Sequence, residues 1–164
     1  MVNVCMEIET TRDIARQILR HRSFSFQEFS QRYATAEAFE TRECRKQDMV
    51  NRQNSLALDV YGNDEDRYLA TWWDEIQNRM TKEAEFLYES AISKGIAKEV
   101  ARALLPEGLT ASRLYMNGTL RSWIHYIEIR CDKATQKEHR EVAEQCRDII
   151  FEQFPSIEEV LNEG

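Results

Sequence analysis

Three basic side chains stand next to one another at Arg20, His21 and Arg22, where a predicted helix ends. Cations there complement the helix dipole, and this alone would explain one or two of them. The next residues are rich in hydroxyl, amide, carboxylate and guanidinium groups: Ser25, Gln27, Glu28, Ser30, Gln31 and Arg32. Guanidinium and hydroxyl groups bind phosphate, whereas amides and carboxylates bind the edges of a base or sugar. The residue types therefore favour an anion or nucleotide site.

The charge of the chain is acidic overall and basic locally. The net charge is -7, which argues against a protein that coats nucleic acid. Between Arg12 and Arg45, however, there are seven arginines and no lysine. Arginine binds phosphate or carboxylate through two parallel hydrogen bonds, so this cluster also indicates a local anion site.

The sequence offers few alternatives to this chemistry. The four cysteines form no CxxC pair, and the three histidines lack the spacing of metal ligands, so we expect no metal. Cys131 is expected to be inert packing, and His139, in the polar stretch TQKEHRE, is expected on the solvated surface. No signal peptide or membrane-spanning stretch is predicted, which favours a cytoplasmic protein with reduced thiols and no membrane partner.

The periodicity predicts one helix-rich α+β domain over residues 1–164, with long helices and a small mixed or antiparallel sheet. Strands are expected at residues 2–9 and 110–117, and a short one near Tyr33 after a loop. Helices are expected at residues 11–22, 64–94, 96–104, 119–131 and 135–153. Thr10 or Thr11 would cap the first helix, and Asp64 or Asp66 the second, which Gly95 would end.

Two apolar stripes follow the helical period. The long helix carries a stripe that predicts core or a subunit interface: Leu69, Trp72, Trp73, Ile76, Met80, Ala84, Leu87 and Ala91. The last helix is expected to face inward with Val142, Cys146, Ile149 and Ile150.

The segment RHRSFSFQEFSQR, from Arg20 to Arg32, resembles the signature RHRxxSxNxxSxR of the flavin-dependent thymidylate synthases. Gln27 departs from the pattern, which has Asn there, but it retains the amide. A second segment, from Glu99 to Arg130, resembles the second conserved block of that family. It contains an arginine before a Leu-Pro step and a segment of the form RSxxHxxxxR.

The resemblance implies roles for individual residues. Contacts to FAD are implied for Arg20, His21, Arg22, Glu28, Arg121 and His125. Contacts to dUMP are implied for Gln17, Arg20, Glu28, Phe29, Ser30, Gln31, Arg32, Arg102 and Arg130. Arg130 would be the catalytic residue, lying near the uracil and favouring its N3-deprotonated form. Ser30 and Cys131 would not act as nucleophiles, since the family is understood to need none.

The implied reaction is the reductive methylation of dUMP to dTMP with 5,10-methylenetetrahydrofolate as carbon donor, FAD as cofactor and NADPH as reductant. The implied partners are dUMP, folate, NADPH and copies of the chain itself, in a homotetramer that shares its sites between subunits. Members of the family usually carry about 50–60 further residues before the first strand expected here. An inactive dUMP-binding module is therefore the alternative hypothesis.

Overall fold

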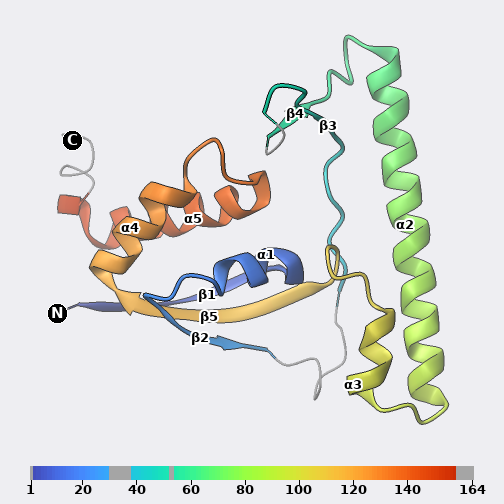
Figure 1. The fold of residues 1–164 in the computed structure, drawn as a ribbon, viewed down its shortest axis with the longest axis horizontal. Coiled ribbons are helices and arrows are strands. Elements are labelled where there is room, and N and C mark those ends of the chain that lie inside the picture. Colours follow the sequence, from blue (N-terminus) through green and yellow to red (C-terminus); the bar gives the residue numbers. More distant parts are fainter. Residues whose placement is uncertain (1, 30–37, 52–53, 158–164) are drawn as a thin grey trace.

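The computed structural model describes residues 2–29, 38–51 and 54–157. A three-stranded antiparallel sheet has the order β1-β5-β2, from β1 (Asn3–Thr11), β5 (Ala111–Thr119) and β2 (Ser25–Glu28). Three helices lie over one face of this sheet: α1 (Arg12–Ile18), α4 (Leu120–Arg130) and α5 (Lys137–Gln153) (Figure 1). The α+β class predicted from the sequence is confirmed, and the sheet is antiparallel.

Alternation along the strands decides which side of the sheet is buried. In β1 and β5, Met6, Ile8, Leu114 and Met116 point to the helices and are buried, while their neighbours are exposed. The helices add the largest buried side chains of this core, Ile14, Ile18, Trp123, Tyr126 and Ile150. The apolar face of the sheet and the helices α1, α4 and α5 therefore share one core.

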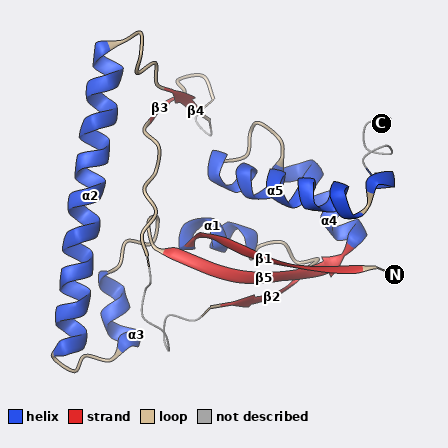
Figure 2. Cartoon of the chain, turned by 180° about the vertical axis from the view of Figure 1, so that it is seen from behind, coloured by secondary structure: helices blue, strands red, loops and turns tan. Residues whose placement is uncertain are grey.

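A second, smaller core lies beside this layer. The long helix α2 (Asp64–Ser93) packs against α3 (Lys98–Ala101) and the 3-10 turn η1 (Arg102–Leu104), around buried Tyr88, Ala91 and Ala101. Figure 2 shows α2 and α3 standing apart from the sheet. Two short strands, β3 (Arg45–Gln47) and β4 (Ser55–Ala57), form a hairpin before α2.

The segment that leads into β3 is bound to α2 by hydrogen bonds between side chains of α2 and its backbone. Gln77 of α2 donates from Nε2 to the carbonyl of Arg42 at 3.0 Å and accepts from the Arg42 amide at 2.7 Å. The Trp73 indole donates to the same carbonyl at 2.8 Å. A buried amide on α2 thus binds the connecting segment as a neighbouring strand would.

The first helix and its following strand differ from the prediction. The helix expected at 11–22 ends at Ile18, and a strand at Ser25–Glu28 replaces the expected loop, because these residues pair with β5 from Asn117 to Leu114. The strand expected near Tyr33 falls outside the described residues. Thr11 is the N-cap of α1 by position, but its hydroxyl donates to Asp13 instead of capping the helix.

The predicted ends of α2 were partly right. Its N-cap is Asn63 rather than Asp64 or Asp66: the Asn63 side chain accepts from the amide nitrogens of Glu65 and Asp66. Gly95, with φ of +81°, follows the helix as predicted.

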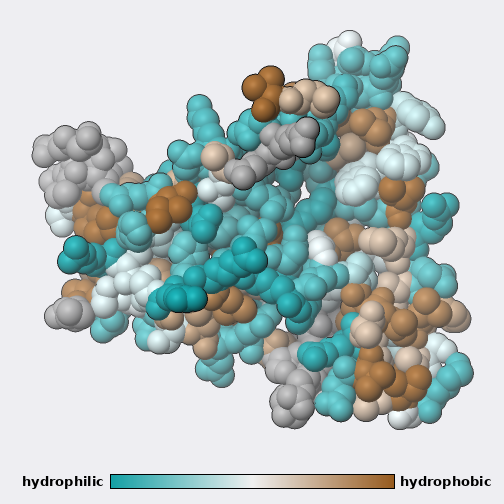
Figure 3. Space-filling model, in the orientation of Figure 1, coloured by the Kyte–Doolittle hydropathy of each residue, from teal (hydrophilic) through white to brown (hydrophobic). Residues whose placement is uncertain are grey.

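The stripe predicted on α2 is core only at Ala84 and Ala91, which are buried as predicted. The other buried residues of α2 were not in the stripe: Asp66, Gln77, Thr81 and Tyr88. Trp72, Met80 and Leu87 of the predicted stripe are more than 40% exposed. Figure 3 shows hydrophobic side chains gathered over the part of α2 next to α3, where exposed Phe86, Leu87, Val100 and Leu104 lie. The interface reading of the stripe stays a prediction.

The other helices lie close to their predicted ranges. Thr119 caps α4, accepting from the Ser122 amide at 3.2 Å. In α5, Cys146 and Ile150 face the core as predicted, but Ile149 is 48% exposed. No helix in the described parts of the chain is both long enough and apolar enough to span a membrane.

Candidate functional site

Two helices carry the predicted site residues and end next to each other. After α1, the His21 amide donates to the carbonyl of Ile18 at 3.1 Å, and the chain turns towards β2. Arg130 is the last residue of α4. Its Nε donates to His21 Nε2 at 2.9 Å. The fold thus joins the first signature segment to the end of the second.

Arg130 is a cation without a counter-ion among the described residues. Its side chain is partly buried, and no carboxylate of a described residue lies within ion-pair distance of its guanidinium. Burial, followed by the charge of Arg130 and by His125, lowers the pKa of His21 to about 4. Neutral His21 therefore accepts at Nε2 and carries its proton on Nδ1. The remaining N–H groups of Arg130 are available to a ligand.

Behind Arg130 lies a buried histidine. His139 is 0% exposed, with Nε2 at 3.2 Å from the Tyr126 hydroxyl and Nδ1 at 3.4 Å from Oε1 of Gln17. Burial, followed by Arg130 and His21, lowers the pKa of His139 to about 4, so the ring is neutral. Because the Gln17 oxygen can only accept, the His139 proton lies on Nδ1 and Tyr126 donates to Nε2.

Gln17 and Arg130 line one surface depression, which we call the Arg130 depression. Its other members come from the end of α4 and the loop before α5: Ile129, Asp132, Ala134, Thr135 and Gln136. Gln17 Nε2 donates to Oε1 of Gln136 at 2.8 Å. The depression thus offers a cation, two amides, a hydroxyl and the Asp132 carboxylate, and its cation and amides suit an anionic ligand with polar edges.

Two predicted residues lie at the end of β2, and Glu28 is on the helix-covered side of the sheet, as is its cross-strand partner Leu114. Glu28 accepts from the Ser112 hydroxyl at 3.1 Å and lies 3.9 Å from Arg12. Phe29 is 49% exposed. Three further predicted substrate residues, Ser30, Gln31 and Arg32, lie outside the described residues.

The other predicted cations are at the surface. The side chains of Arg20, Arg22 and Arg121 are exposed and make no hydrogen bond or ion pair with described residues. His125 is also exposed, with Glu128 at 3.8 Å from its Nδ1, so it is not a core residue. Arg102 lies on η1, beside α2, where its Nε donates to the carbonyl of Glu99 at 3.2 Å. One chain therefore does not bring Arg102 or Arg121 to Arg130.

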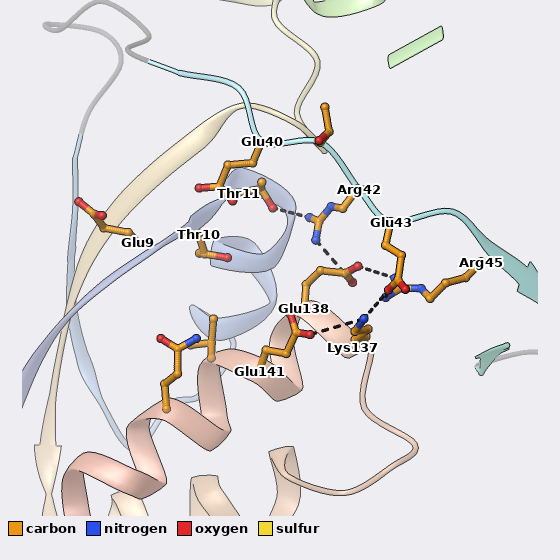
Figure 4. Close-up of a pocket in the computed structure, with 13 residues that line it drawn as sticks. Glu9, Thr10, Thr11, Glu40, Arg42, Glu43, Arg45, Lys137, Glu138 and Glu141 are labelled. Carbon is orange, nitrogen blue, oxygen red and sulfur yellow. Dashed lines mark hydrogen bonds and ion pairs between the residues drawn. The ribbon is translucent and has the colours of Figure 1, made fainter. Parts of the chain in front are cut away.

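The arginine cluster divides into paired and unpaired members. Figure 4 shows Arg42, from the segment before β3, and Arg45, the first residue of β3, pointing towards Glu138 at the start of α5. Arg42 also lies 2.7 Å from Asp13, and Arg16 pairs with Glu107. Arg42 and Arg45 thus join the segment around β3 to α5 through largely buried ion pairs, whereas the Arg16–Glu107 pair is exposed. Among the described arginines between Arg12 and Arg45, only the side chains of Arg20 and Arg22 have no carboxylate partner. The predicted anion site is therefore best placed at the signature segment that begins with these residues.

Glu138 is the centre of the paired group. It accepts from Arg45, lies 3.4 Å from Arg42 and accepts from Gln136 Nε2 at 3.0 Å. Burial alone would raise the pKa of Glu138, but hydrogen bonds from its own backbone amide, Gln136 and Arg45 hold the pKa below its ordinary value. The same carboxylate therefore fixes both the connecting segment and the loop that lines the Arg130 depression.

Comparison with known proteins decides the family. Residues 1–156 match the family model described as "Thymidylate synthase complementing protein". The chain is 52% identical over 161 residues to a flavin-dependent thymidylate synthase of Synechocystis sp. (strain ATCC 27184 / PCC 6803 / Kazusa), covering 98% of this chain and 72% of that protein. The chain belongs to the flavin-dependent thymidylate synthase family.

A viral protein and a solved structure extend this result. The chain is 48% identical over 158 residues to a probable flavin-dependent thymidylate synthase of Paramecium bursaria Chlorella virus 1, covering 96% and 70% of the two chains. The crystal structure of a UMP/dUMP methylase, PolB from Streptomyces cacaoi, bound with 5-Br UMP, aligns with a TM-score of 0.78 at 25% identity. That alignment covers 92% of this chain and 69% of that one.

His139 is a buried residue that the sequence did not predict to be buried. The expectation that His139 is solvated was wrong, because on α5 it shares the face of Ala143, Cys146 and Ile150. The spacing of four, three and four residues was a signal that the polar neighbours of His139 obscured. Cys131 is partly buried, and burial raises its pKa, which disfavours the reactive thiolate, in agreement with the prediction that it is inert.

Proposed function

We propose that the protein converts dUMP to dTMP as a flavin-dependent thymidylate synthase. In this reaction 5,10-methylenetetrahydrofolate gives its one-carbon unit to C5 of the uracil, and NADPH supplies the reducing equivalents through FAD. The products are dTMP, tetrahydrofolate and NADP⁺. The observation that carries the proposal is the Arg130 depression, where the two family segments meet at a partly buried guanidinium that no described carboxylate pairs with.

The charge on Arg130 suits the chemistry of uracil. A carbon nucleophile at C5 requires electron density that builds up as negative charge on the ring and its oxygens. Arg130 is held at Nε by a neutral His21, so its positive charge is not cancelled locally. A fixed cation beside the ring stabilises this negative charge in the transition state. Gln17, at the edge of the same depression, offers an amide to the polar edge of the base.

The unpaired arginines fit the pyrophosphate of FAD. Arg20 and Arg22 follow α1, Arg121 lies in the first turn of α4, and all three are exposed without a partner among described residues. Guanidinium groups without a carboxylate partner are free to bind phosphate. We assign them, with His21 and His125, to FAD binding. The flavin, when bound, supplies the hydride, and the chain supplies position and electrostatic field.

Complete sites would require more than one chain. Arg102 and Arg121 are both assigned to binding, yet in one chain Arg102 lies on η1, beside α2, and Arg121 lies on α4. Figure 1 shows α2 and α3 standing apart from α4. The apolar surface on α2 and α3 supports self-association, because exposed patches of this kind mark interaction sites. We propose a homotetramer in the cytoplasm whose subunits share dUMP, FAD, folate and NADPH sites.

Flavin and nucleotide titrations test the proposal. The purified protein, supplied with FAD, should absorb in the flavin region, and dUMP should perturb this absorbance. It should form dTMP when methylenetetrahydrofolate and NADPH are added. Arg130→Ala should abolish turnover and keep the circular dichroism spectrum, whereas full activity in that variant would refute the role of Arg130. Binding of dUMP without dTMP formation would instead favour the alternative, an inactive dUMP-binding module.

A further inference from the structure

The face of α5 that packs against α1 and α4 carries one polar residue in an otherwise apolar row. Ala143, Cys146 and Ile150 are its buried neighbours, and His139 is as fully buried as they are. Burying an imidazole is costly unless its nitrogens form hydrogen bonds. Both nitrogens of His139 have partners, and one of those partners is Gln17, which lines the Arg130 depression.

The direction of each hydrogen bond in this group is determined. The oxygen of Gln17 accepts from His139 Nδ1, so the amide nitrogen of Gln17 must point the other way, where it donates to Gln136. Tyr126, 1% exposed, donates its hydroxyl proton to Nε2 and thereby selects the His139 tautomer that can donate to Gln17. The chain of contacts runs from a buried hydroxyl to an amide at the surface.

We propose that His139 is a positioning residue for substrate recognition, which sets the orientation of the Gln17 amide and thereby presents an N–H group to a pyrimidine ligand. With its oxygen held by His139 and one N–H held by Gln136, Gln17 keeps one free N–H. That group suits a carbonyl oxygen such as those of uracil. Without a donor at position 139 the amide can turn over and present its oxygen instead. The inference rests on the proposed function for the identity of the ligand.

Two conservative substitutions separate this role from simple packing. The side-chain nitrogen of Asn occupies roughly the place of Nδ1, whereas that of Gln occupies the place of Nε2. His139→Asn therefore retains a donor towards Gln17 and loses the contact with Tyr126. His139→Gln retains a partner for Tyr126 and loses the donor towards Gln17. Both variants lose the ring, so a purely structural role predicts that they behave alike.

The experiment measures the dissociation constant for dUMP by calorimetry on the flavin-loaded protein. His139→Gln should weaken dUMP binding by about 3- to 10-fold, the range for one hydrogen bond, and His139→Asn should restore binding to within about 2-fold. In a Gln17→Ala background, His139→Gln should cause no further loss, because the two residues act through one amide. Cys146→Ala, on the same face of α5, is the control for lost packing and should leave dUMP affinity unchanged.

Additive losses in the double variant, or equal losses in His139→Asn and His139→Gln, would overturn the proposal. A second readout does not depend on any ligand. The side-chain amide resonance of Gln17, identified by its absence in Gln17→Ala, should move in His139→Gln and stay in His139→Asn. If the wild-type protein binds no dUMP, the proposed function fails, and this resonance still decides whether His139 orients Gln17.

Discussion

Lowering the pH should unfold this protein in part through His139. The folded protein holds the pKa of His139 near 4, and the ordinary value of the exposed side chain is 6.5. Between these values the unfolded chain takes up a proton that the folded chain refuses, so stability rises with pH. The stability is complete above about pH 6.5 and is lost as the pH falls towards 4. The two pKa values correspond to a loss of at most about 3 kcal/mol.

The assay is urea denaturation of the wild type and of His139→Asn at a series of pH values, at one fixed protein concentration. The variant has no titrating group at this position, so its free energy of unfolding should fall less between pH 7 and pH 4. The wild type should lose more unfolding free energy over this pH range than the variant, by an amount that approaches about 3 kcal/mol. Other groups titrate in both proteins and cancel in this comparison. Equal pH dependence in the two proteins would refute the assignment of a buried, neutral His139.

His21 is expected to contribute in the same direction and less strongly. Its pKa is also lowered to about 4, by burial, by Arg130 and by His125. Since its side chain is partly exposed, water screens these effects and reduces their contribution to stability.

Three further substitutions test other parts of the structure. Asn63→Ala removes the cap of α2 and should lower the free energy of unfolding by about 1 kcal/mol, measured by urea denaturation. Gly95→Ala forces a side chain into a positive φ and should cost about 1 kcal/mol, while Gly108→Ala, with open space and no positive φ, is its control. Glu138→Ala leaves Arg42 and Arg45 without their shared carboxylate and should lower stability by about 2–4 kcal/mol; a loss below about 1 kcal/mol would contradict its central role.

The sequence predicted the helices and the two long strands well, since their periodic patterns are long. It failed where tertiary contacts override local preference. The segment at Ser25–Glu28 has too few residues to show strand alternation, and it becomes a strand because β5 offers a free edge. On α2 the large apolar side chains Trp72, Met80 and Leu87 of the predicted stripe lie outside, while buried Gln77 binds the backbone of Arg42.

The sequence could predict several residues of the candidate site, but it could not predict how the fold brings them together. Arg20, His21 and Arg130 were singled out as basic or motif residues, but only the register of β1, β5 and β2 brings α1 and α4 to one end of the sheet. His139 could not be assigned, because its role depends on Gln17, which lies far away in the sequence. Hydrogen bonds between distant side chains leave no periodic trace in a single sequence.

The most direct test of the proposed function is whether the purified protein makes dTMP from dUMP. The reaction mixture would contain the full chain, FAD, NADPH and methylenetetrahydrofolate carrying a ¹³C label in its one-carbon unit, with Arg130→Ala as the matched control. We predict dTMP with the label in its C5 methyl group, and none with Arg130→Ala or without FAD. Unlabelled dUMP recovered intact from a wild-type protein that binds both FAD and dUMP would contradict the proposal.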